Sequence, residues 1–261
     1  MTPPIYNISL VNHSVLFPDA DLQLLANILQ IQATRDLLPV WGITVRMFWT
    51  PAGAQPHPDH WVGGIFDNSD VANALGYHDL TVNNLPLWKI FAQTAKADGT
   101  DLFVTASHEN LEMGVNPWLD RIRQVGSILY AEEPGDPDEI DADGYDITIP
   151  AGWPSARTTK RVSNFVYPNW YQPMAPGPYD QMNRLTKPLQ IAPGGYTSLF
   201  DLNNPSAGWV QANGRMDTAA QQVRSRPHIG SRRALRLIPR DQWVRSTYTP
   251  GDTAVPAQEA A

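Results

Sequence analysis

A histidine and two glutamates lie close together in the segment SHENLE at 107–112. If this segment is helical, His108 and Glu112 lie on the same face, because residues four apart are separated by about one turn. Both side chains can then reach one ion. Glu109 is offset around the helix, where it can hold a water molecule and act as a general base. The spacing therefore predicts a metal-binding helix that activates water.

The composition limits the ligands that such a metal site can use. The chain has 261 residues and no cysteine, so disulfides and thiolate ligands are excluded and a metal must use His, Asp or Glu. The familiar zinc-protease motif has a second histidine where this chain has Glu112, and a carboxylate oxygen is an acceptable replacement. Spacing alone does not decide the matter, because the same pattern also occurs on exposed helices as a solvated face.

The elements that must position this helix can be predicted from hydrophobic periodicity. Alternating, β-branched stretches predict strands, and apolar residues three or four apart predict helices. Pro39 is expected to end the first helix. The order favours an α+β fold with a mixed sheet. The predicted strands are 5–10, 43–49, 60–66, 75–81 and 87–92, and the predicted helices are 19–37 and 102–113.

The second half of the chain has a different composition. Aromatic residues, prolines and glycines dominate residues 153–209. We expect an N-terminal part at 1–117 with the metal-binding helix, a loop-rich part at 118–249 packed on it as one unit, and a flexible tail at 250–261. The aromatic residues Tyr167, Trp170, Tyr171 and Tyr196 are numerous enough to line a cleft, although the core is their default place.

An acidic segment suggests a second, weaker metal hypothesis. Residues 132–146 hold eight Asp and Glu residues, several of them alternating before Gly144. Hard oxygen ligands around a sharp turn can bind Ca²⁺, so a calcium site at 136–146 is one interpretation. In a loop counted from Glu139, the first position is Glu and the twelfth is Pro150, which rules out an EF-hand. A solvated acidic loop is the plainer interpretation.

A basic segment follows near the C-terminus. Residues 224–245 hold seven arginines and His228, while the whole chain has a net charge of −7. The overall charge disfavours nucleic-acid binding. The arginines fit better as partners of the acidic loop or of a neighbouring subunit, so a homo-oligomer or a larger assembly remains open.

Nothing at the N-terminus resembles an export signal, and no apolar run approaches the ~20 residues that cross a membrane. We therefore expect no membrane partner. The compartment stays open between the cytoplasm and an assembled particle.

Five segments resemble a family of largely uncharacterised bacterial proteins that are regarded as zincin-like zinc metalloproteases. The resemblance extends over about 5–247. The segments that carry it are SHENLEM at 107–113, LGYHD at 75–79, VSNFVYP at 162–168, PGGY at 193–196 and GSRR at 230–233.

The resemblance implies a zincin-like mixed sheet, a zinc ion and a peptide or protein substrate. The family's Glu-x-x-Asp element is matched by Glu133 and Asp136, so Glu133 is the expected third ligand and Asp136 the second choice. His78 lies where zincins place the edge strand that pairs with substrate, and it could orient the substrate or polarise a carbonyl. A phenol such as Tyr167 could stabilise an oxyanion.

The expected chemistry is hydrolysis by a water that zinc activates. Zinc would be held by His108, Glu112 and Glu133, and Glu109 would move a proton from the water to the leaving amine. The family usually has Asp where this chain has Asn116 and Asn164. These departures permit the alternative of a non-catalytic structural or interaction protein, such as a virion component, on a degenerate zincin-like scaffold.

Overall fold

The computed structural model describes residues 4–70, 74–81, 83–139, 141–153 and 155–214. The GSRR segment, the basic segment 224–245 and the tail expected at 250–261 lie outside the described residues.

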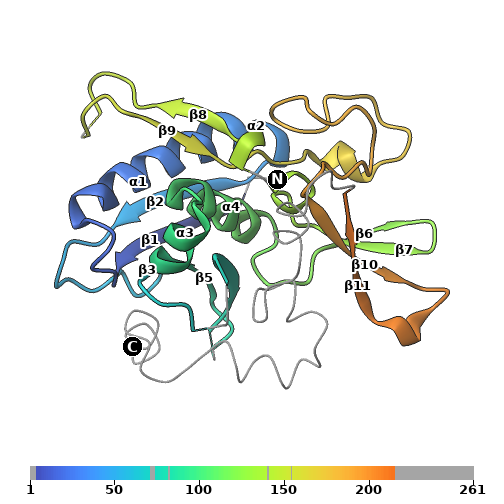
Figure 1. The fold of residues 1–261 in the computed structure, drawn as a ribbon, viewed down its shortest axis with the longest axis horizontal. Coiled ribbons are helices and arrows are strands. Elements are labelled where there is room, and N and C mark those ends of the chain that lie inside the picture. Colours follow the sequence, from blue (N-terminus) through green and yellow to red (C-terminus); the bar gives the residue numbers. More distant parts are fainter. Residues whose placement is uncertain (1–3, 71–73, 82, 140, 154, 215–261) are drawn as a thin grey trace.

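A five-stranded mixed sheet forms the centre of the N-terminal part (Figure 1). Its order is β2-β1-β3-β5-β4, in which β4 is an antiparallel edge strand and the other strands run parallel. The predicted α+β class and mixed sheet are confirmed. The strands are β1 (Ile5–Asn12), β2 (Thr44–Trp49), β3 (Trp61–Phe66), β4 (Gly76–Leu80) and β5 (Pro86–Phe91).

Two helices cover one face of this sheet. Helix α1 (Asp19–Ile31) packs on β1 and β2, and α4 (Leu102–Val115) packs on β4 and β5. Between helices and sheet lies the main core, which holds Leu25 of α1, Ile8 of β1 and Trp88 of β5. Burial of these apolar faces is the main force that fixes α4 against the sheet.

The first helix does not end at Pro39 as the sequence predicts. A π-helix (Gln32–Leu37) and a short helix α2 (Leu38–Trp41) extend it to Gly42, which has φ 66° and caps the end in the left-handed region. Pro39 lies in the first turn of α2, where a missing N–H is tolerated. A short helix α3 (Ala92–Asp98) was also not predicted, because it follows β5 without a break.

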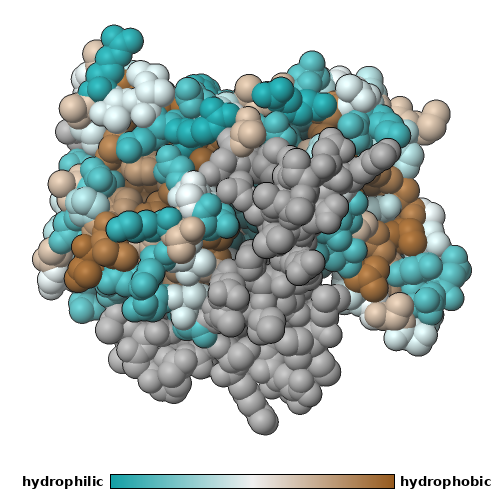
Figure 2. Space-filling model, viewed as in Figure 1, coloured by the Kyte–Doolittle hydropathy of each residue, from teal (hydrophilic) through white to brown (hydrophobic). Residues whose placement is uncertain are grey.

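The remaining described chain is rich in strands, loops and 3₁₀ turns. A four-stranded antiparallel sheet has the order β11-β10-β7-β6, and β8 pairs with β9 in a separate hairpin. On the face shown in Figure 2, hydrophobic residues are scattered among hydrophilic ones. These strands are β6 (Ile122–Val125), β7 (Ile128–Ala131), β8 (Tyr145–Thr148), β9 (Thr159–Val162), β10 (Tyr196–Asp201) and β11 (Trp209–Asn213), and the 3₁₀ turns are Asp136–Asp138, Asp141–Asp143, Pro168–Tyr171 and Pro205–Ala207.

Helix α4 is enclosed on two sides. Its cap is Asp101, whose carboxylate accepts a hydrogen bond from the Phe103 amide at 2.8 Å. On the side away from the sheet, the residue after β9, Ser163, donates its amide to the Ser107 hydroxyl at 2.7 Å. Every residue from 103 to 115 is buried. Polar side chains on α4 must therefore find partners inside the protein.

None of the helices in the described ranges has the length and apolar character that a membrane span requires.

Candidate metal centre

Helix α4 brings His108, Glu109 and Glu112 into the protein interior. Their exposed fractions are 7%, 6% and 3%. His108 Nε2 lies 3.3 Å from Glu112 Oε1, one turn along the helix. The predicted helix and the predicted pairing of these two side chains are therefore present, but they face the protein interior and not solvent.

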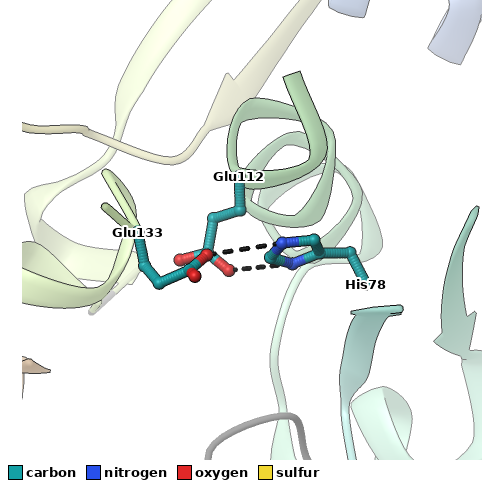
Figure 3. Close-up of side chains that lie close together, drawn as sticks. All are labelled: His78, Glu112 and Glu133. Atoms are coloured by element: carbon teal, nitrogen blue, oxygen red, sulfur yellow. Dashed lines mark ion pairs between the residues drawn. The ribbon is translucent and has the colours of Figure 1, made fainter. Parts of the chain in front are cut away.

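The edge strand β4 supplies a second histidine. His78 is fully buried, and its ring faces Glu112 and Glu133 (Figure 3). Its Nδ1 lies 3.2 Å from Glu112 Oε2 and 3.6 Å from Glu109 Oε2, and its Nε2 lies 3.3 Å from Glu133 Oε2. A Cβ atom on Gly76 would lie 3.0 Å from Glu109 Oε1, so the absence of a side chain there makes room for Glu109.

The loop after β7 supplies two carboxylates, and local contacts set their directions. Asn116 Nδ2 donates a hydrogen bond to Glu133 Oε1 at 2.7 Å. The other carboxylate oxygen, Oε2, faces His78. A Cβ atom on Gly135 would lie 2.6 Å from His108 Nδ1, so a glycine is needed where the loop crosses the ring. Asp136 Oδ1 then lies 3.6 Å from His108 Nε2.

Two sets of three side chains in the described chain could hold a metal ion, and they share Glu112. The first is His78, Glu112 and Glu133, and the second is His108, Glu112 and Asp136. Within each set the ligand atoms lie within 4.8 Å of one another, and all the residues are buried. We call these five residues the α4 cluster.

The first choice of triangle predicted from the sequence is not one of these sets, whereas the triangle with the second choice, Asp136, is. His108, Glu112 and Glu133 were expected to hold one ion, but Glu133 faces His78, and Asp136 takes the place beside His108. His78 was expected only to contact substrate or polarise a carbonyl, yet it lies among the side chains that could hold an ion. Glu109, the predicted base, lies next to the cluster with Oε2 3.6 Å from His78 Nδ1, and it belongs to neither set.

The electrostatics of the cluster favour protons or a cation. Burial raises the pKa of Glu112 well above its usual range, and the negative charges of Asp136 and Glu133 add to the effect. Burial acts to lower the pKa of His108, but Glu112 and Asp136 outweigh it, and the pKa lies well above 6.5. Both shifts favour the protonated forms of Glu112 and His108 when no ion is present.

Tyr167, the expected oxyanion phenol, is not brought to the cluster. Its hydroxyl donates to Gln181 Oε1 at 2.7 Å, and it lines an open pocket of about 640 Å³ bordered by 177–181. Burial raises its pKa, as do Asp36 and Asp180, which are not cluster members.

A phenol that does lie near the cluster is Tyr171, which the sequence named only among the aromatic residues that could line a cleft. It is buried, and its hydroxyl lies 3.4 Å from the Ala131 carbonyl and 3.5 Å from the Glu133 carbonyl. Burial raises its pKa well above 10, and the charge of Glu133 adds to this. No spacing signal in the sequence distinguishes Tyr171 from Tyr167.

In the acidic loop proposed for calcium, Asp138 and Asp143 interact with each other, whereas Asp136 and Asp146 point to other partners. Asp136 faces His108, Asp138 contacts Asn164, and the exposed Asp146 lies 3.5 Å from Arg161 Nη1. Among the described residues, no metal-competent set includes Asp138 or Asp146. Calcium in this loop therefore stays a prediction without support from the geometry.

Comparisons with known proteins found no match for this chain. No family model matches the chain, and neither a curated protein nor a solved structure matches it. What can be said of the α4 cluster therefore rests on its own geometry.

Proposed function

We propose that this protein is a zinc-dependent hydrolase that cleaves peptide bonds. The observation that carries the proposal is the buried α4 cluster, in which two histidines and three carboxylates converge while Glu109 lies beside them. The choice of peptides as the substrate class comes from the resemblance to zincin-like proteases and not from the geometry.

The spacing of the donor atoms fits zinc. Zinc binds nitrogen and oxygen at about 2.0–2.2 Å, so neighbouring ligands of a tetrahedral ion lie roughly 3.3–3.5 Å apart. The four nitrogen–oxygen distances within the cluster are 3.2, 3.3, 3.3 and 3.6 Å. Direct N–H···O hydrogen bonds are most often about 2.9–3.0 Å long. In the second set both distances, 3.3 and 3.6 Å, start from His108 Nε2, so Glu112 and Asp136 are spaced roughly as ligands around one ion are. In the first set Glu112 and Glu133 face opposite nitrogens of His78, and only one of these nitrogens can bind an ion.

In the proposed reaction, the α4 cluster would bind the metal ion and Glu109 would transfer the proton. A bound zinc ion supplies Lewis acidity, which lowers the pKa of water and polarises a carbonyl. Glu109, 3.6 Å from His78 and not a member of either ligand set, would accept a proton at its carboxylate and pass it to the leaving amine. Asn116 would hold Glu133 in its binding orientation.

One observation favours a second function. The side chains of the cluster and of Glu109 are at most 8% exposed. Structural zinc sites are closed, whereas catalytic sites keep one open position. An ion could therefore tie β4 and the loop after β7 to α4 in a non-catalytic structural or interaction protein, including a component of a larger particle.

The test measures metal content and peptide cleavage in the same preparations. Undialysed protein is analysed by mass spectrometry for metals as wild type, Glu112→Ala, Glu109→Gln and Glu132→Gln. Glu132 is the matched control, because it is buried in the same loop but is paired with Arg121 Nε at 2.7 Å. We expect stoichiometric zinc that is lost only in Glu112→Ala.

Cleavage of a peptide library then separates the two functions. Cleavage by wild type that is lost in Glu109→Gln supports the hydrolase. Zinc without cleavage in any preparation supports the structural role. A wild-type protein that contains no metal and takes up no added zinc would contradict both the hydrolase and the structural zinc role.

A further inference from the structure

We propose that the α4 cluster holds two divalent ions, with the carboxylate of Glu112 bridging them. The inference rests on the metal binding in the proposed function, but it goes beyond that function in the number of ions and in the role of His78. One ion would be bound by His78, Glu112 and Glu133, and the other by His108, Glu112 and Asp136.

The two oxygens of Glu112 face different histidines. Oε1 lies 3.3 Å from His108 Nε2, and Oε2 lies 3.2 Å from His78 Nδ1. The carboxylate therefore lies between a ligand from its own helix and one from β4. A carboxylate that gives one oxygen to each ion is suited to two-metal sites, where the ions lie about 3.5–4 Å apart.

The ligands divide evenly between the two positions. Each position has one histidine, one carboxylate of its own and a share of Glu112. Each ion would thus have three protein ligands, the number that leaves a catalytic zinc one open position. With a single ion in the second set, His78 and Glu133 would be left as a buried pair with no ion to bind.

The charge of the cluster also fits two ions. Glu109, Glu112, Glu133 and Asp136 are four carboxylates within one buried region, together with two imidazoles. For these six side chains alone, one divalent ion leaves a charge of −2 when both imidazoles are neutral, and two ions bring it to zero. Buried charge that is not balanced is strongly unfavourable.

His78 can serve as a ligand without a large movement of its ring. Its Nε2 lies 3.3 Å from Glu133 Oε2, and Figure 3 shows the ring edge turned toward both carboxylates. One nitrogen would bind the ion, and the other would donate a hydrogen bond to a remaining carboxylate oxygen. This second contact is how proteins fix the orientation of metal-binding histidines.

The test is a titration of the chelator-treated full chain with Co²⁺, followed by visible absorbance and electron paramagnetic resonance. Near-isosteric variants avoid cavities, and circular dichroism checks that each one is folded. The set is wild type, His78→Gln, Asp136→Asn and Glu112→Gln, with His57→Gln as the control because His57 is exposed and lies outside the cluster.

We expect wild type and His57→Gln to bind two equivalents, with the resonance signal weakened at the second equivalent by coupling between the ions. His78→Gln and Asp136→Asn should each bind one equivalent, and Glu112→Gln should bind neither ion tightly. One equivalent in wild type, or two that survive in His78→Gln, would overturn the two-ion centre while leaving a single metal site. No binding in wild type would overturn the proposed function as well.

Discussion

Two buried carboxylates of this protein, Glu112 and Asp180, are held in opposite ways. Asp180 accepts hydrogen bonds from the amides of Met182, Arg184 and Leu185 at 2.9, 3.0 and 2.7 Å, and one from Asn164 Nδ2 at 3.0 Å. We call Asp180, Asn164 and Asp138, which also contacts Asn164, the Asp180 network. Glu112 instead lies between two histidines at 3.2 and 3.3 Å, with Asp136 and Glu133 nearby.

The different surroundings of these two carboxylates indicate a structural role for Asp180 and a metal-binding role for Glu112. A carboxylate that accepts several backbone amides is stabilised by the chain itself, and it closes a loop. A carboxylate that lies among like charges and histidines is stabilised only when protons or a cation enter. The Asp180 network is therefore expected to support stability, and the α4 cluster is expected to support metal binding.

The largest effect should come from the shared ligand. In Glu112→Gln both ligand sets lose a charged oxygen, so we expect zinc binding to be abolished while the fold is kept, because the amide fills the same space. Competition of the protein with a coloured chelator measures the affinity. An affinity equal to that of wild type would remove the distinction between Glu112 and Asp180.

The next largest effect is expected at Glu109, which lies beside the cluster but belongs to neither ligand set. In Glu109→Gln the metal should remain, while kcat/KM on a cleaved peptide falls about 10²–10⁴-fold through loss of the general base. Steady-state kinetics on metal-analysed protein checks both halves. Loss of the metal together with the rate would place Glu109 among the ligands.

Asp180→Ala should lower the stability of the fold while zinc binding is kept. Removing the carboxylate leaves the buried Leu185 amide and the part-buried Arg184 amide without this acceptor, while the Met182 amide still donates to Asn164 Oδ1, so we expect the free energy of unfolding to fall by about 1–3 kcal/mol. Urea unfolding measures this loss, and the zinc content per folded chain should not change. A stable variant that has lost zinc would contradict the assignment of the two regions.

Two buried asparagines, Asn116 and Asn164, give a matched pair because one contacts the α4 cluster and the other the Asp180 network. Asn116→Asp removes the donor to Glu133 and places a second carboxylate beside it, so zinc affinity should fall about 10–100-fold. Asn164→Asp alters the Asp180 network, so it should change the urea midpoint and not the affinity. Equal effects of the two variants on affinity would show that Asn116 does not position Glu133.

The smallest effect is a difference between histidines in the metal-free protein. His108 should titrate above pH 6.5, because Glu112 and Asp136 outweigh burial and raise its pKa, whereas burial and His57 lower the pKa of His60. Protonated His108 then stabilises the fold fully below about pH 6.5, and this contribution is lost as pH rises through its folded pKa. A nuclear magnetic resonance titration checks the order, and the reverse order would contradict it.

The sequence predicted the α+β class and the helix that carries His108 and Glu112, because both depend on local periodicity. Alternating residues identified the strands of the central sheet, and the four-residue spacing placed His108 beside Glu112. The helix end predicted at Pro39 was wrong. Pro39 lies in the first turn of α2, where a residue without a backbone N–H is tolerated.

The composition of the site could not be predicted in full, because it depends on contacts between distant segments. Spacing within the loop after β7 does not show that Glu133 faces His78 while Asp136 faces His108. Asn116 and the close approach of Gly135 to the His108 ring decide this. His78 became a candidate ligand only when the structure showed β4 packed against α4, with the ring 3.2 Å from Glu112.

The central claim is tested most directly by diffraction from crystals grown with zinc, with data collected on both sides of the zinc absorption edge. An anomalous difference map should show one peak between His108, Glu112 and Asp136 and a second between His78, Glu112 and Glu133. A map with no peak in the α4 cluster, from protein that is otherwise well ordered there, would contradict the account.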